Sequence, residues 1–206
     1  MRLYGRMATV FSGERQMGVE MRRREELIRA TILVIGEAGS LDITVSRIAK
    51  KAGVSPALAF HYFGDKERLF LASMRHVLRS YHNDVVTALS SASTPRERLE
   101  RIVHASFAPA NFHRGVIAAW LNFYVLAQSS EEAHRLLRIY HSRLRSNFVH
   151  DLRPLVGDRA ETVAGRLGAL IDGLYLRLVL TPVESAGETA IETVLATLQN
   201  ELNAAS

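Results

Sequence analysis

Groups that suit phosphate oxygens lie close together between Thr44 and Lys66. The Tyr62 hydroxyl, the Lys66 ammonium and the free amides at the start of a helix can all donate hydrogen bonds to phosphates. The same range includes the string Ile48–Ser55, in which two short helices are expected to cross at a tight turn. The chemistry expected here is binding to a nucleic-acid backbone.

The string Ile48–Ser55 has the spacing of a helix-turn-helix motif. Ala49 is small enough to let the two helices approach, and Gly53 supplies a turn conformation that residues with a Cβ atom resist. Val54 is expected to fill the space between the helices. An ordinary corner between two helices could carry the same pattern, so the spacing favours DNA binding without establishing it.

An enzyme or metalloprotein built on a helical bundle is the rival class. Glu131 and His134 form one Glu-x-x-His piece of a di-iron carboxylate site, but the chain has no second piece. His141 lies further along the same predicted helix, and these side chains are interpreted as a solvated face. His61 would need a partner and a cleft to act as a base. With no Gly-rich phosphate loop or nucleophile elbow either, we expect no catalytic residue, no metal and no cofactor.

Every long segment has helical periodicity, and no stretch alternates over strand length. The fold class is therefore all-α, with about nine helices. Gly39 is placed to end the first helix, and Ser55 followed by Pro56 is a strong start signal. The predicted helices are Arg22–Ala38, a short one capped by Thr44 and ending at Lys51, one of about seven residues after Ser55, one from Asp65 to about Ala92, one from Thr94-Pro95, Arg114–Gln128, one from Ser130 to Leu152, one starting at Asp158 with Glu161, and about Gly187–Leu202.

Composition narrows the class of protein. The 206 residues include no Cys, which excludes disulfides and thiolate metal sites and favours a reducing compartment, the cytoplasm. No apolar run reaches the roughly 18 residues of a membrane span. The first twenty residues lack the apolar region of a secretory signal and are interpreted as a loose tail, in which Met17 or Met21 is an alternative start. The net charge is +5, and residues 22–66 hold eight basic and five acidic residues, a bias that suits a polyanionic partner.

The string His61–Phe70 resembles the end of the recognition helix and the start of the long helix that follows it in the TetR family of transcriptional regulators, with Tyr62-Phe63 as the aromatic pair and Lys66 in place. The resemblance implies a three-helix DNA-reading domain in which Tyr62 and Lys66 contact phosphates. Many members carry Tyr where this chain has Phe60, so a phosphate contact commonly made there is not expected, and Phe63 is assigned to the core. The DNA-binding residues expected by position are Thr44, Arg47 and Lys50 near the backbone, Ser55, Pro56, Ala57, Leu58 and His61 on the recognition helix, and Tyr62 and Lys66.

Nearly the whole chain resembles the choline-responsive repressors within this family. The resemblance covers about Arg22 to Leu202 and rests on Arg23–Leu33 with Gly36–Ser40, Ala118–Tyr124, Leu136–Asn147 and Ala169–Arg177. It implies a homodimeric repressor of choline-uptake and glycine-betaine synthesis genes that choline releases in osmotic stress. The alternative is a TetR-type repressor that responds to another small cation or drug, such as a polyamine.

Residues of the C-terminal half are compatible with a choline site. A quaternary ammonium offers no hydrogen-bond donor and is best held by aromatic faces. Trp120 and Tyr124 share one helix face, and Asp172 precedes Tyr175 by about one turn. Trp120, Tyr124, Asp172 and Tyr175 are therefore predicted to bind the ligand, with Tyr140 as a weaker candidate. The open alternative is that the aromatic residues are plain core and Asp172 is a satisfied buried polar group.

The last two predicted helices carry the expected dimer interface. Their apolar residues exceed what one subunit was expected to bury, and Gly165 and Gly168 would allow close helix approach. A two-fold dimer implies a roughly palindromic operator, with recognition helices about 34–36 Å apart. The predicted organisation is a flexible tail (1–21), a helix-turn-helix domain (22–68) and a ligand-binding and dimerisation domain (69–206).

Overall fold

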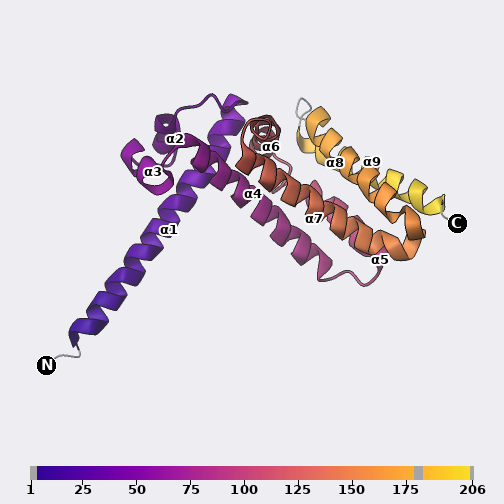
Figure 1. Cartoon of the computed structure of the whole chain (residues 1–206), viewed down its shortest axis with the longest axis horizontal. Coiled ribbons are helices and arrows are strands. Elements are labelled where there is room, and N and C mark those ends of the chain that lie inside the picture. The colour runs from indigo at the N-terminus through magenta and orange to yellow at the C-terminus, as the bar shows by residue number, and fades with distance from the viewer. Residues whose placement is uncertain (1–3, 179–182, 205–206) are drawn as a thin grey trace. The chain divides into compact units, whose positions relative to one another are not determined.

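The computed structural model describes residues 4–178 and 183–204. In these residues nine α-helices and one 3₁₀ turn are present and no strand occurs, which confirms the all-α class (Figure 1). None of the described helices is both long and apolar enough to cross a membrane. The elements are α1 (Tyr4–Ala38), α2 (Val45–Lys51), α3 (Pro56–Phe63), α4 (Lys66–Leu89), α5 (Pro95–Ser106), α6 (Arg114–Leu126), α7 (Glu131–Val156), η1 (Gly157–Arg159), α8 (Ala160–Leu178) and α9 (Val183–Asn203).

The chain forms two compact units, Met1–Ser73 and Met74–Ser206. Helix α4 begins in the first unit and ends in the second. In the first unit α1 packs on α2 and α2 on α3. Leu27, Ile48 and Leu69 are almost fully buried in this unit. Its hydrophobic side chains therefore fix the two short helices, α2 and α3, on which any DNA contact depends.

Local signals set the helix ends of the first unit as predicted. Helix α1 ends at Ala38, and Gly39 follows with a φ of 66°. Thr44 caps α2, and Ser55 caps α3 with Pro56 in its first turn. Gly53 takes a φ of 68° in the turn between them, a conformation that glycine adopts without strain. The turn of the helix-turn-helix motif is thus built from the residues that the sequence indicated.

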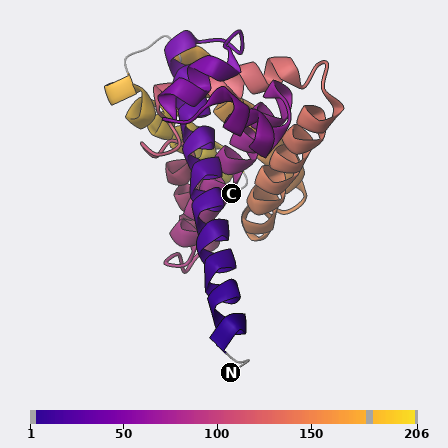
Figure 2. The same cartoon turned by 90° about the vertical axis from the view of Figure 1, so that its left-hand side faces the viewer.

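Helix α1 begins at Tyr4, well before the predicted start at Arg22. The earlier residues include Ala, Arg, Glu, Gln and Met, which favour helix, and no proline. In two views the N-terminal half of α1 extends away from α2 and α3 (Figures 1 and 2). This part of the helix therefore depends on local propensity, which the expectation of a loose tail did not weigh.

The second unit is a helical bundle in which α7 packs on α5, α6 and α8, and α8 packs on α9. A capping box of Thr94 and Glu97 starts α5. Helix α7 continues through Pro154 to Val156, past the predicted end at Leu152, although Pro154 lacks the amide hydrogen that a helix residue donates to the carbonyl four residues earlier. Gly157 then ends α7, and η1 precedes α8, so the predicted start at Asp158 belongs to the 3₁₀ turn.

Candidate functional site

Helix α3 presents one face to solvent and the opposite face to the core. Ala59 and Phe63 are buried, whereas Ser55, Ala57 and His61 are exposed. Pro56 is exposed as well, and Leu58 and Tyr62 are half-buried. Phe60 is also exposed, with 49% of its surface accessible. The expected base-reading residues therefore lie on a face that a DNA groove could reach, although their contact with DNA stays a prediction.

Arg24 of α1 holds the end of α3. Its guanidinium donates to the Tyr62 carbonyl oxygen over 2.6 Å, and its Cζ lies 4.6 Å from the centre of the Phe63 ring. Phe63 is only 6% exposed, as its assignment to the core predicted. The sequence analysis did not single out Arg24, because its partners lie far along the chain. This residue fixes the orientation of α3 from behind.

Two hydroxyls that are predicted to contact DNA also cap helices. Thr44 Oγ1 accepts from the Arg47 amide, and Ser55 Oγ accepts from the Leu58 amide, each over 3.2 Å. A hydroxyl that accepts in this way keeps its own hydrogen for another acceptor. Both groups can therefore cap a helix and still donate to a phosphate.

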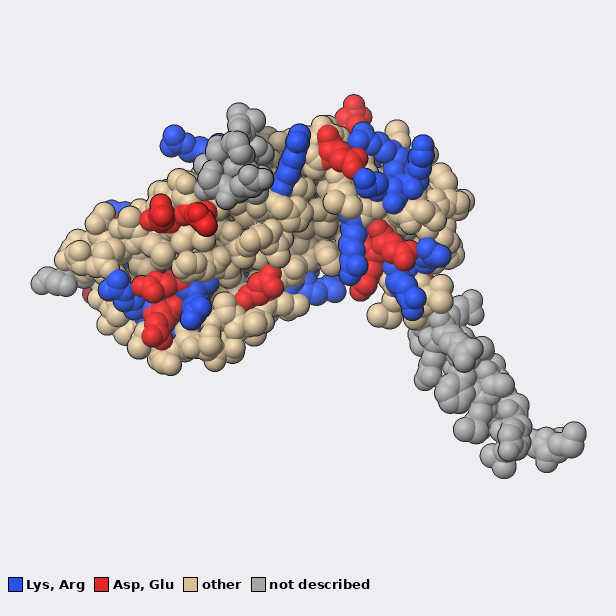
Figure 3. All heavy atoms as spheres, turned by 180° about the vertical axis from the view of Figure 1, so that it is seen from behind, with Lys and Arg blue, Asp and Glu red and all other residues tan. Residues whose placement is uncertain are grey.

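The basic residues in and near α2 differ in whether they form an ion pair with Glu37. Glu37 of α1 pairs with Lys51 over 2.5 Å and with Arg47 over 3.4 Å. The hydrogen bond from Lys51 is the main cause that lowers the pKa of Glu37, and Arg47 lowers it further. Lys50 is exposed, and Lys66 is half-buried with its Nζ 5.5 Å from the centre of the Phe70 ring. On the face shown in Figure 3, basic side chains gather with acidic ones on the right-hand region of α1 to α3. Because it pairs with Glu37, Arg47 must share its charge between this carboxylate and any DNA phosphate.

A cavity of about 450 Å³ lies in the second unit. All four predicted ligand residues, Trp120, Tyr124, Asp172 and Tyr175, line it, and so does the weaker candidate Tyr140. The remaining lining residues are Leu121, Val125, Gly173 and Leu176. Pockets for small ligands commonly span about 300–1,000 Å³, so the volume suits a small molecule. Helices α6, α7 and α8 each contribute to the wall.

The rings of the cavity pack against one another at its wall. The Trp120 ring centre lies 4.6 Å from that of Tyr140 and 6.4 Å from that of Tyr124. Among the described lining residues Asp172 is the only one with a formal charge. The cavity is therefore an aromatic box with one carboxylate.

His141 joins this site, which the sequence analysis missed. Its Nε2 lies 2.8 Å from the Tyr124 hydroxyl and 3.3 Å from Asp172 Oδ2. The interpretation of His141 as part of a solvated face is incomplete, because the side chain is part-exposed but contacts both groups. Its partners come from α6 and α8, so helical spacing along α7 carried no signal for them. His134, in contrast, is exposed as expected, and the described residues contain no His, Asp and Glu group able to hold a metal.

The tyrosines of the site stay protonated. Burial raises the pKa of Tyr140 and Tyr175 well above the usual value, and the Asp172 carboxylate adds to this effect. Burial and Asp172 raise the pKa of Tyr124 in the same way. The tyrosines therefore offer neutral rings and hydroxyls, and the negative charge of the cavity comes from Asp172.

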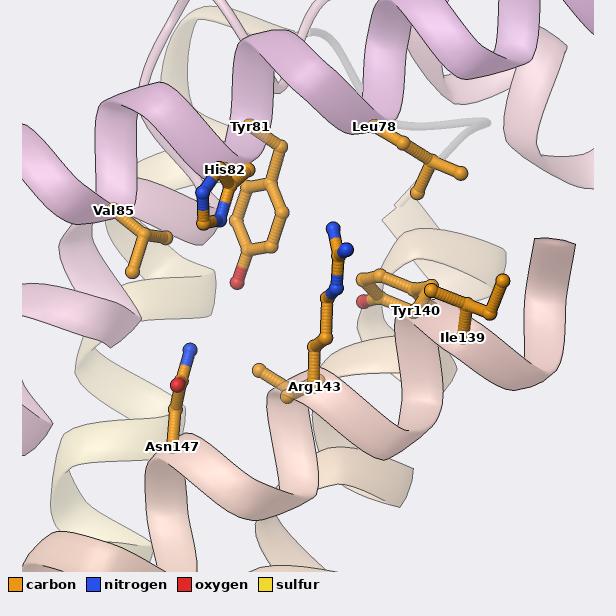
Figure 4. A pocket seen from close by; sticks show the side chains of 9 residues that line it. Leu78, Tyr81, His82, Val85, Ile139, Tyr140, Arg143 and Asn147 are labelled. Carbon is orange, nitrogen blue, oxygen red and sulfur yellow. The ribbon is translucent and has the colours of Figure 1, made fainter.

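A second, smaller crevice lies between α4 and α7, behind Tyr140 (Figure 4). It has a volume of about 40 Å³, enough for a few water molecules at most. Tyr81 of α4 and Tyr140 of α7 both reach into it, with ring centres 6.1 Å apart. Tyr140 thus borders the aromatic cavity on one side and the crevice beside α4 on the other.

The apolar faces of α8 and α9 are less available than the sequence suggested. Most of the apolar residues expected at a dimer interface are buried within one chain, because α8 and α9 pack on each other and α8 packs on α7. These are Val163, Leu167, Ile171, Leu174, Val194 and Leu198. Leu170, Ile191, Leu195 and Leu202 are half-buried. Gly165 and Gly168 have no neighbouring atoms within 4 Å of a Cβ position, so a second helix could approach there.

Comparison with known proteins identifies the two units. Residues 27–73 match the family model described as bacterial regulatory proteins, tetR family. Residues 95–203 match the model described as BetI-type transcriptional repressor, C-terminal. The chain is 52% identical to the HTH-type transcriptional regulator BetI of Brucella anthropi over 80% of this chain and 86% of that protein. The protein of the same name from Rhizobium meliloti is 45% identical over 92% of each chain.

Solved structures share the fold. A transcriptional regulator from Pseudomonas aeruginosa superposes with a TM-score of 0.70 at 26% identity, over 89% of this chain and 91% of that one. A regulator from Saccharomonospora viridis, solved in complex with choline, has a TM-score of 0.77 at 20% identity, over 87% and 96% of the chains. The second likeness shows the fold alone. The chain belongs to the TetR family of bacterial transcriptional regulators, as a DNA-binding repressor with a BetI-type C-terminal domain.

Proposed function

We propose that this repressor controls genes for choline uptake and glycine-betaine synthesis, and that choline releases it from its operator. The observation that carries the proposal is the aromatic cavity with a single carboxylate. The name BetI of the relatives and the choline bound to the Saccharomonospora viridis regulator support the choice of ligand.

The cavity chemistry suits a quaternary ammonium. A cation over an aromatic face gains about 0.5–2 kcal/mol, more when water is excluded. Trp120 and Tyr140 are buried and offer such faces, and Asp172 supplies a counter-charge. A polyamine with several ammonium groups would require several carboxylates, and the described lining contains one. Choline is therefore the best-supported ligand.

On the DNA side, we assign positioning to one set of residues and base reading to another. Thr44, Lys50, Tyr62 and Lys66 contact phosphates, and Arg47 does so in competition with Glu37. Ser55, Pro56, Ala57, Leu58 and His61 face the base edges, because they lie on or beside the exposed side of α3. Two copies of the chain, joined through the half-buried residues of α8 and α9, read a palindromic operator.

The test measures ligand rank order and operator binding on the same protein. Calorimetry with choline, betaine aldehyde, glycine betaine and spermidine should place choline first, and a saturating amount should weaken operator binding roughly 5- to 150-fold. Spermidine binding more tightly than choline would instead favour a polyamine-responsive regulator. Unchanged operator affinity with choline bound would reject choline as the effector.

A further inference from the structure

Two hydrogen bonds join α4 to the segment that ends α5. The Tyr81 hydroxyl of α4 lies 3.1 Å from Ser106 Oγ. The Asn111 side-chain amide donates to Asp84 Oδ2 of α4 over 2.8 Å. Ser106 and Asn111 belong to the 106–112 segment, which runs from the last residue of α5 into the turn before α6. All of these residues lie in the second unit.

The same segment is held from the cavity side by Tyr175. The Tyr175 hydroxyl donates to the Ser106 carbonyl oxygen and lies 3.3 Å from that of Asn111. Its ring packs between Phe107 and Phe112, with centres 5.5 Å and 5.0 Å away. Tyr175 also lines the aromatic cavity. One residue therefore contacts the ligand space and both ends of the segment that binds α4.

The hydrogen bonds of the 106–112 segment have a fixed direction. Ser106 is buried and donates its hydroxyl hydrogen to the Ile102 carbonyl over 2.9 Å, so Tyr81 must be the donor in the bond to Ser106. Asn111 is 4% exposed, and its amide donates to Asp84 and to the Ala105 carbonyl. With water excluded, a shift of either residue must move its α4 partner or leave a buried group unpaired.

Helix α9 restricts the segment on another side. A Cβ atom at Gly187 would lie 3.2 Å from the Phe107 carbonyl oxygen, so α9 approaches this backbone closely. The segment thus has little free space in which to absorb a movement of Tyr175. A displacement of the Tyr175 ring is more easily passed to Ser106 and Asn111.

We propose that Tyr175 and the 106–112 segment couple ligand binding to α4. A ligand in the cavity displaces the Tyr175 ring, the displacement shifts Ser106 and Asn111, and Tyr81 and Asp84 carry it to α4. Because α4 continues into the first unit, this shift changes operator binding. The inference rests on the proposed function, in that it requires a ligand in the cavity. Tyr175 and Asn111 are positioning residues in this scheme.

The first experiment measures the coupling itself. Choline affinity is determined with and without operator DNA for the full chain, and the ratio of the two affinities is the coupling, from which intrinsic affinity cancels. In the original protein this ratio should lie between roughly 5 and 150. Tyr81→Phe and Asp84→Ala, which lie outside the cavity, should keep the choline affinity of the free protein but lower the ratio at least threefold. Tyr175→Phe should lower the ratio equally.

Tyr124→Phe is the matched control. It removes a hydroxyl from another tyrosine of the same cavity, one whose partner His141 lies on α7 and not on α4. Its ratio should equal that of the original protein. A ratio unchanged in Tyr81→Phe and Tyr175→Phe, or reduced equally in Tyr124→Phe, overturns the proposal.

The second experiment needs no ligand. Hydrogen exchange of the free protein should become several-fold faster at residues 74–89 and 106–112 in Tyr175→Phe, and should remain unchanged there in Tyr124→Phe. Exchange that does not change in Tyr175→Phe overturns the coupling route. Absence of choline binding in the original protein would reject the proposed effector, while the exchange result would still decide the role of Tyr175.

Discussion

The DNA-reading unit and the cavity-bearing unit are built from contacts of different range. Around α2 and α3, the groups that set the helix ends and the turn are neighbours in sequence: Thr44 accepts from the Arg47 amide, Ser55 accepts from the Leu58 amide, and Gly53 makes the turn. Only the contact of Arg24 with the end of α3, among those described above for that helix, joins residues far apart in sequence. The cavity combines α6, α7 and α8, and His141 meets Tyr124 and Asp172 only in the folded chain. Local chemistry specifies the helix ends and the turn of the first site, whereas tertiary packing brings together the residues of the second.

A change in the turn should have the largest effect, because it should abolish the function of the first unit and leave that of the second intact. Gly53→Val places a β-branched residue at a φ of 68°, where strain costs about 1–3 kcal/mol. Operator binding should be lost, while choline binding in the second unit is retained. Calorimetry and an operator titration measure the two properties.

Gly53→Asn is the control, because Asn tolerates this conformation better than Val. No atom lies within 4 Å of a Cβ at Gly53, so the two variants differ in backbone strain rather than in crowding. Equal effects of Val and Asn would show that the turn conformation is not the cause.

Removal of the cavity charge should have the opposite pattern, with weaker ligand binding in the second unit and unchanged DNA binding in the first. Asp172→Asn keeps the size of the side chain and deletes the counter-charge, so choline should bind about tenfold more weakly, which corresponds to roughly 1.4 kcal/mol. Operator binding without ligand should not change. Asp158→Asn, an exposed carboxylate outside the cavity lining, is the matched control in the same calorimetric titration.

One change at the start of α4 and one on α3 test the division between residues that position the protein on DNA and residues that read bases. Lys66→Ala should weaken binding to all DNA sequences alike and reduce the salt dependence by about one phosphate contact. Ala57→Ser should instead alter the preference between operators, by about 1–3 kcal/mol at the base that it faces. Binding to a set of operator variants at several salt concentrations measures both. A uniform effect of Ala57→Ser would remove this residue from base reading.

The smallest expected effect concerns His141 at the edge of the cavity. Its Nε2 lies 2.8 Å from the Tyr124 hydroxyl and 3.3 Å from Asp172 Oδ2, so it helps to hold two of the lining side chains in place. His141→Ala should weaken choline binding roughly threefold, about the loss of one hydrogen bond, and calorimetry measures it. An unchanged affinity would exclude His141 from the site.

The sequence predicted the helices and the types of residue that line the cavity. It did not predict contacts between residues that lie far apart in the sequence. Trp120, Tyr124, Asp172 and Tyr175 could be selected because helical spacing groups them in pairs. The bonds of Tyr175 to Ser106 and Asn111 could not be predicted, since they join α8 to a turn between other helices. For the same reason the burial of α8 and α9 against their own bundle was underestimated.

The exposed side of α3 has a consequence for how such regulators diversify. Ala57 is exposed, while the orientation of the helix is fixed from behind by Arg24 and by the buried Ala59 and Phe63. Replacements on the outer side therefore cost the fold little. Descendants of one gene can acquire new target promoters through such replacements while the inherited scaffold and effector pocket remain unaltered.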